Sequence, residues 1–115
     1  MLSRRRIEKG AEVSVNPLPK FRKEIDALDD QIVDLLSRRF AIAGEVAAYK
    51  AKSGVAVRLE DRIAEVLTRN ADRATQNGAE AEAIRAIYKT IIDVTCAFEE
   101  GKIKFSGEPN ASARL

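Results

Sequence analysis

A nearly unbroken seven-residue apolar repeat near the N-terminus is the feature that most constrains this fold. Apolar side chains recur at alternating spacings of three and four residues from 18 to 49, with a charged exception at 39. The repeat consists of Leu18, Phe21, Ile25, Leu28, Ile32, Leu35, Arg39, Ile42, Val46 and Tyr49. This spacing lines them along one side of a single helix, as in a coiled coil. We therefore predict a helix from about Pro19 to Lys52 that ends at Ser53-Gly54, because glycine suits a helix C-terminus.

The predicted helix is too long for a compact monomer of this size. At a rise of 1.5 Å per residue it would be about 50 Å long. A compact chain of 115 residues has a radius of gyration of only about 13 Å. The helix would extend beyond the rest of the chain, and its apolar side would need a partner. The sequence therefore predicts a homodimer in which the long first helices pair.

The rest of the chain carries two shorter helical patterns. We predict a second helix from about Leu59 to Thr75 and a third from about Glu80 to Glu100, with Asn77-Gly78 ending the second. Apolar side chains line one stripe of the third helix, namely Ile84, Ile87, Ile91, Val94 and Phe98, widened by Tyr88, Ile92 and Thr95. Alternating strand patterns are missing, so we predict an all-α domain over residues 17–100, with flexible tails at 1–16 and 101–115.

Composition excludes several classes of catalytic site. The chain has no histidine and one cysteine, Cys96. Ser-His-Asp and Cys-His nucleophile systems and histidine-bearing metal sites are therefore excluded, and an internal disulfide is impossible. We interpret Cys96 as an inert packing residue and expect no metal site. An enzyme built from this sequence must work with Arg, Lys, carboxylates and hydroxyls.

Charge and hydropathy bear on partners and on location. The formal net charge of +2 is too small to indicate nucleic acid, and we interpret the run of arginines at 4–6 as part of a solvated end. Apolar runs do not approach the roughly 18 residues of a membrane span, and no apolar segment of a secretory signal follows the first charges. We expect a cytoplasmic protein that binds neither nucleic acid nor a membrane.

Three cations along the first helix are candidates for binding an anion. Arg39 interrupts the apolar repeat, where an unpaired charge would be costly. Lys50 follows eleven residues later on the same side of the helix, about 16 Å along the axis, so the two side chains can reach one ligand. Arg22 precedes Arg39 by about 25 Å and would join such a site only from a partner chain.

Each candidate also has an ordinary structural explanation. Arg39 could pair with a carboxylate such as Asp34 or Glu45 at a dimer interface, and Arg22 could pair with Asp26. Lys50 could be a solvated cation that complements the helix dipole. Near the end of the third helix, Glu99 follows the line of Tyr88, Ile92 and Thr95, so it either faces inward or is solvated. Spacing alone leaves these alternatives open.

Three stretches together resemble the all-helical, type II chorismate mutase family, which includes the related isochorismate pyruvate lyases. They are FRKEIDALDDQIVDLLSRRFAIAGEVAAYKAKSG, VRLEDRIAEVL and IYKTIIDVTCAFEE, and the likeness extends from about Phe21 to Glu100. Its most specific part is Arg22, the pattern I-D-x-L-D-x-x-I-x-x-L-L, then Arg39, Lys50 and Arg62, in the order and spacing of the family. The resemblance implies two interlaced three-helix chains with two sites, each completed by an arginine of the other subunit.

The resemblance also implies roles for individual residues. Arg39 and the Arg22 of the other chain would hold the two carboxylates of chorismate, and Lys50 would reach a carboxylate and the ether oxygen. Arg62 and Thr95 would line the pocket. Glu99 stands where bacterial members commonly have Gln and fungal ones Glu. A carboxylate there would repel the developing charge of the ether oxygen, so we expect Glu99 to act protonated and to donate a hydrogen bond.

The family reaction fits this small set of residues. Conversion of chorismate to prephenate, in aromatic amino-acid biosynthesis by the shikimate pathway, is an intramolecular [3,3] rearrangement that needs no nucleophile, proton transfer or cofactor. An enzyme for it must select a chair-like conformer and stabilise the charge that separates as the ether bond breaks. Cationic side chains can do both. The leading prediction is therefore a chorismate mutase, an isomerase without a cofactor.

Two residues beside Arg62 depart from the mutase pattern. Where mutases commonly have Asp and Glu, this chain has Leu59 and Ile63, and in the family the Glu contacts the ring hydroxyl. Isochorismate pyruvate lyase, which forms salicylate, and aminodeoxychorismate mutase are therefore alternatives, although the lyases typically have Gln at the position of Glu99. Glu60 or Asp61 could replace the lost contact if the second helix begins differently. A non-enzymatic alternative is a helical dimerisation module.

Overall fold

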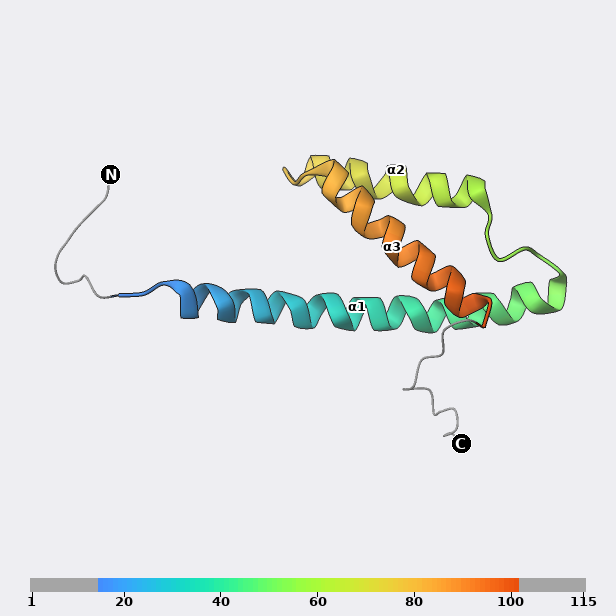
Figure 1. Cartoon of the computed structure of the whole chain (residues 1–115), viewed down its shortest axis with the longest axis horizontal. Helices are drawn as coiled ribbons and strands as arrows, with labels where there is room; N and C mark the ends of the chain where they lie inside the picture. The colour runs from blue at the N-terminus through green and yellow to red at the C-terminus, as the bar shows by residue number, and fades with distance from the viewer. Residues whose placement is uncertain (1–14, 102–115) are drawn as a thin grey trace, which may run out of the picture. The chain divides into compact units, whose positions relative to one another are not determined.

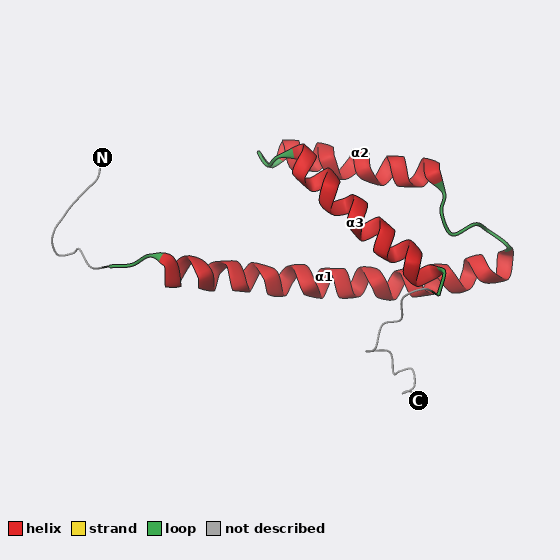
Figure 2. Cartoon of the chain, in the orientation of Figure 1, coloured by secondary structure: helices red, strands yellow, loops and turns green. Residues whose placement is uncertain are grey.

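The computed structural model describes residues 15–101, which form three α-helices and no strand (Figure 2). The helices are α1 (Leu18–Ser53), α2 (Glu60–Gln76) and α3 (Ala81–Glu99). The prediction of an all-α chain with one long first helix is confirmed. Each helix begins and ends within one residue of the predicted position. Most of the two predicted tails, at 1–14 and 102–115, falls outside the described residues. None of the described helices combines the length and the apolarity needed to cross a membrane.

Local capping interactions explain where the helices begin and end. At the start of α1 the Asn16 side-chain oxygen accepts a hydrogen bond of 3.0 Å from the backbone N–H of Leu18, and Pro17 directly precedes this first helical residue. After α1, Gly54 adopts a φ of +71°, and after α2, Gly78 adopts +74°. Residues with a side chain rarely adopt these values, so the two glycines end their helices at little cost.

The chain divides into two compact units at residue 38, and α1 contributes residues to both. In the described part of the N-terminal unit, residues 15–38, the apolar repeat is exposed. Phe21, Ile25, Leu28 and Ile32 are 50–55% accessible. Large apolar side chains in a regular line at this accessibility form a surface that is unfavourable to leave in water. Pairing of this surface in a homodimer stays a prediction.

The C-terminal unit has a small core between α2 and α3, which form a hairpin (Figure 1). Its buried members are Val66, Ile92 and Cys96, against which Val57, Ile63, Leu67 and Tyr88 pack. Cys96 is thus confirmed as a packing residue. The predicted stripe of α3 is wrong at Ile87, which is 54% exposed. The most deeply buried line of α3 instead follows Tyr88, Ile92 and Cys96, so Ile87 falls at its margin.

The last turns of α1 belong to the same unit and pack on the C-terminal end of α3. Ala43 is buried, and the ring of Phe98 lies 3.7 Å from where a β-carbon on Gly44 would be. The last turns of α1 therefore meet α3 through side chains, namely the ring of Phe98 over Gly44 and the hydrogen bonds of Arg39 and Lys50 to Thr95 and Glu99.

Candidate functional site

The C-terminal unit contains a pocket of about 490 Å³, including its part open to solvent. Its polar lining consists of Arg39, Lys50, Arg62, Thr95 and Glu99, and its apolar lining of Val57, Leu59, Ile63, Val66, Ile92 and Cys96. All the site residues predicted from the sequence, apart from Arg22, therefore meet in this pocket. The space in it that water-sized molecules can occupy is about 120 Å³.

Lys50 is the most closely held cation of the pocket. Its ammonium donates a 2.7 Å hydrogen bond to the backbone carbonyl of Val57 and a 3.1 Å bond to Glu99 Oε1. The Lys50 and Glu99 side chains are only 14% and 7% exposed, so this is a largely buried ion pair and Lys50 is not a solvated helix-end cation. An ammonium has three N–H donors. Two of them have partners here, so the third is available to a ligand.

Arg39 is oriented by a short relay on α3. Its guanidinium donates a 3.1 Å hydrogen bond to the Thr95 hydroxyl, which donates in turn to the backbone carbonyl of Ile91 at 2.7 Å. Because an Arg carries five N–H donors, the bond to Thr95 leaves most of them for an anion. Thr95 therefore lines the pocket and also holds Arg39 in place.

Arg62 lies at the edge of the pocket rather than inside it. Its side chain is 65% exposed and forms a 2.8 Å ion pair with Glu65 one turn further along α2. Such an exposed pair is weak. Arg62 can therefore turn toward an anionic ligand at little cost.

One wall of the pocket, at the beginning of α2, is apolar. Leu59 precedes the first residue of α2 and provides no side-chain cap, and Ile63 lies one turn later. Glu60 and Asp61 are not among the lining residues, and the Glu60 carboxylate is bonded to Arg58 instead. The idea that Glu60 or Asp61 replaces the missing acidic contact is therefore wrong for this start of α2.

The overall chemistry of the site is that of an anion pocket. Three cationic side chains and one carboxylate face a largely apolar interior, which suits a small organic molecule with more than one negative charge. Burial raises the pKa of the Cys96 thiol, so at neutral pH this lining residue is an uncharged and poor nucleophile. Among residues 15–101, no three His, Cys, Asp or Glu side chains are grouped so that they could hold a metal ion.

Comparison with known proteins decides the family. The model of the type II chorismate mutase family matches residues 21–100. The chain belongs to this family. It is 31% identical over 100 residues to a 4-amino-4-deoxychorismate mutase of Streptomyces pristinaespiralis, an overlap that covers 87% of this chain and 78% of the relative. It is 32% identical over 85 residues to a 4-amino-4-deoxychorismate mutase of Streptomyces venezuelae, covering 74% and 82%.

Membership of the type II chorismate mutase family confirms the resemblance stated from the sequence and makes this chain an enzyme of the mutase class, an isomerase. In this mutase the pocket is built by residues of the C-terminal unit, whereas Arg22 belongs to the N-terminal unit. The role of Arg22 stays a prediction.

Sequence reasoning missed two features of this mutase site. The Val57 carbonyl accepts from Lys50, and Arg58 bonds to carboxylates of α2 and α3. A backbone carbonyl is present at every residue, so no residue type marks the one at Val57. For Arg58 a signal existed, since a cation in a short connector that is followed by the acidic residues Glu60 and Asp61 is a candidate for such pairing.

Proposed function

We propose that this mutase catalyses the [3,3] rearrangement of 4-amino-4-deoxychorismate, with chorismate as the second candidate substrate. The observation that carries the proposal is the buried ammonium of Lys50, which has one N–H left for a ligand beside the oriented guanidinium of Arg39. In the rearrangement the ether oxygen gains negative charge as its bond to the ring breaks. A fixed cation in a pocket of low polarity stabilises this charge more in the transition state than in the substrate.

The cations of the pocket have separate tasks in this proposal. Arg39 would bind one substrate carboxylate, and Lys50 would face the other carboxylate and the ether oxygen. Arg62, at the edge, would turn from Glu65 toward the substrate. Binding both ends of the molecule would favour the folded conformer in which the two reacting carbons approach, which removes much of the entropic part of the barrier.

The two candidate substrates differ at one ring substituent, an amine in one and a hydroxyl in the other. Leu59 and Ile63 give the pocket an apolar wall that offers neither substituent a carboxylate, which sets this chain apart from the pattern of mutases that act on chorismate. The choice of substrate therefore rests on the relatives. Both relatives reported above are named as 4-amino-4-deoxychorismate mutases, and this supports the amine. Rearrangement of chorismate would instead supply prephenate to aromatic amino-acid biosynthesis.

The proposal includes a homodimer. The exposed apolar repeat of residues 18–35 is the surface that a second copy would cover, and the family resemblance implies that Arg22 then reaches the site of the other chain. In this arrangement each pocket would receive one more cation. The extra charge would help to bind a dianionic substrate.

Product identification tests the proposal. The purified protein is incubated separately with 4-amino-4-deoxychorismate, chorismate and isochorismate, and the products are identified by mass spectrometry. We expect the highest kcat/KM with 4-amino-4-deoxychorismate and a rearranged product of unchanged mass. Higher kcat/KM with chorismate would make it the substrate. Release of pyruvate from isochorismate as the fastest reaction would overturn the mutase assignment, and no turnover of any of the three would overturn the proposal.

A further inference from the structure

The connector between α1 and α2, residues 54–59, supplies part of the support for Lys50. The carbonyl of Val57 accepts the shorter of the two bonds that Lys50 donates, 2.7 Å against 3.1 Å to Glu99. The connector is not part of a helix, so its own backbone ladder does not hold this carbonyl in place. The orientation of Lys50 therefore depends on whatever fixes the connector.

Val57 is fixed on one side by packing. Its side chain lies against the core of Val66, Ile92 and Cys96. The carbonyl, however, belongs to the planar peptide unit that joins Val57 to Arg58. Two anchors are needed to fix the plane of that unit, one on each residue. Packing of Val57 supplies the first anchor.

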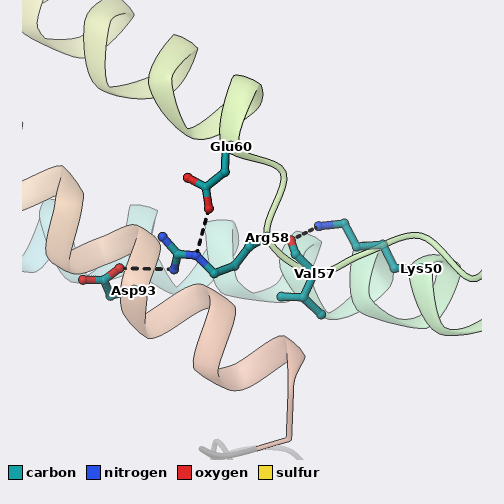
Figure 3. A network of polar contacts seen from close by, with 5 residues as sticks. All are labelled: Lys50, Val57, Arg58, Glu60 and Asp93. Atoms are coloured by element: carbon teal, nitrogen blue, oxygen red, sulfur yellow. Dashed lines mark hydrogen bonds and ion pairs between the residues drawn. The ribbon is translucent and has the colours of Figure 1, made fainter.

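Arg58 supplies the second anchor, through ion pairs to both neighbouring helices. Its Nη1 lies 3.4 Å from Asp93 Oδ1 of α3, and its Nε lies 3.5 Å from Glu60 Oε2 of α2 (Figure 3). The pKa of Arg58 is raised, chiefly by the hydrogen bond to Asp93. Figure 3 shows the guanidinium reaching toward both carboxylates while Lys50 points at the carbonyl of Val57.

We propose that Arg58 is a positioning residue for Lys50: its ion pairs with Asp93 and Glu60 fix the Val57–Arg58 peptide, whose carbonyl orients the Lys50 ammonium in the pocket. Arg58 itself does not line the pocket. Its effect on catalysis rests on the proposed function, in which Lys50 faces the ether oxygen. The effect of Arg58 on the orientation of Lys50 does not depend on the proposed function.

The exposure of the ion pairs limits the size of the effect. Arg58 is 42% exposed, and its partners are 55% and 76% exposed. Pairs of this kind are weak because water screens them, which corresponds to a change of up to about 5-fold in an equilibrium or rate. We expect kcat to fall about 2–5-fold in Arg58→Ala, with a smaller change in KM because Arg39 still binds a carboxylate.

Acetylation of Lys50 measures its orientation without any substrate. The parent, Arg58→Ala, Arg58→Lys and Asp93→Asn are treated with limiting acetic anhydride, and modification of Lys50 is measured by peptide mass spectrometry relative to the exposed Lys89. A matched control is Arg85→Ala, because Arg85 is 40% exposed and also pairs with a carboxylate, Glu82. Thermal unfolding verifies that each variant is folded.

We expect acetylation of Lys50 to rise about 2–5-fold in Arg58→Ala and Asp93→Asn, to be partly restored in Arg58→Lys and to stay unchanged in Arg85→Ala. Equal acetylation in Arg58→Ala and Arg85→Ala would overturn the inference. An unchanged kcat for Arg58→Ala in an active parent would overturn it as well and leave the proposed function standing. If the parent rearranges none of the substrates, the proposed function fails. The acetylation result alone then decides whether Arg58 orients Lys50.

Discussion

The two units of the chain use the same apolar repeat in different ways. In residues 18–35 its side chains are about half exposed, and the charged groups around them are solvated. In residues 39–53 the helix instead directs Ala43, Arg39 and Lys50 at α3, and its repeat members Ile42 and Tyr49 are more than 60% exposed. Arg39, at a repeat position, therefore faces α3, whereas its repeat neighbours Ile42 and Tyr49 remain exposed beside it.

This difference separates two tasks of one helix. The face toward α3 builds the pocket, whereas the apolar members of the repeat form a neighbouring exposed face. The few core residues of the C-terminal unit do not cover this apolar face. Substitutions on each face test whether the two have separate roles in catalysis and association.

The largest effect is expected at the pocket face, from Arg39→Ala. Loss of a preorganised cation that binds the substrate should lower kcat/KM about 100–1000-fold, while association through the other face persists. Steady-state kinetics and light scattering measure the two. The matched control is the neighbouring, exposed Arg38→Ala, for which we expect nearly unchanged activity. Retained activity in Arg39→Ala would make Arg39 an interface residue only.

The repeat face is tested by Leu28→Asp, which places a charge in the middle of the exposed apolar line. A buried unpaired carboxylate at a helix pair is strongly destabilising, so we expect a dimeric parent and a monomeric variant. In the proposed dimer Arg22 of the other chain would then be lost from the site, so we expect activity to fall about 100-fold. Gln31→Asp, off the repeat, is the control. A monomeric parent with full activity would contradict the division of roles.

Local patterns predicted the helices well because helix bounds depend on neighbouring residues. The spacing of the repeat and Gly54 together predicted α1 to within one residue at each end. The pocket could also be predicted in outline, since Arg39 and Lys50 stand out among apolar neighbours and the family resemblance assigned Glu99 and Thr95 to the same site. The helices and the two cations follow from residue type and short-range order, whereas Glu99 and Thr95 were assigned to the site by the family resemblance.

Features that depend on how helices approach one another could not be predicted in the same way. The support of Lys50 by the Val57 carbonyl requires the path of the connector, and the pairing of Arg58 with Asp93 requires the placement of α3. Ile87 fits the periodicity of α3 as well as Ile91 does, yet it is 54% exposed. Periodicity identifies a face but not its margins.

A smaller effect is expected from Glu99→Gln at the pocket face. In the structure the Glu99 carboxylate accepts a 3.1 Å hydrogen bond from the Lys50 ammonium. The amide of Gln can still accept from Lys50 and can also donate to the ether oxygen, so we expect kcat to change by no more than about 10-fold. Steady-state kinetics measures the change, and Glu82→Gln, exposed on α3, is the control that should keep the kcat of the parent. A loss as large as that of Arg39→Ala would show that the charged carboxylate itself is needed.

The smallest effect concerns Cys96. It is buried in the core of the C-terminal unit, whereas the apolar residues of the repeat are exposed. Burial raises its pKa above the ordinary value of 9.0, so the folded state favours the neutral thiol. Its contribution to stability is therefore complete below pH 9 and is lost as the pH rises through the raised pKa. We expect iodoacetamide at pH 8 to alkylate the folded protein about 10-fold more slowly than the urea-unfolded chain, because the thiolate is the nucleophile. The rates are measured by mass spectrometry. Equal rates in the folded and unfolded protein would show that the core between α2 and α3 does not protect Cys96.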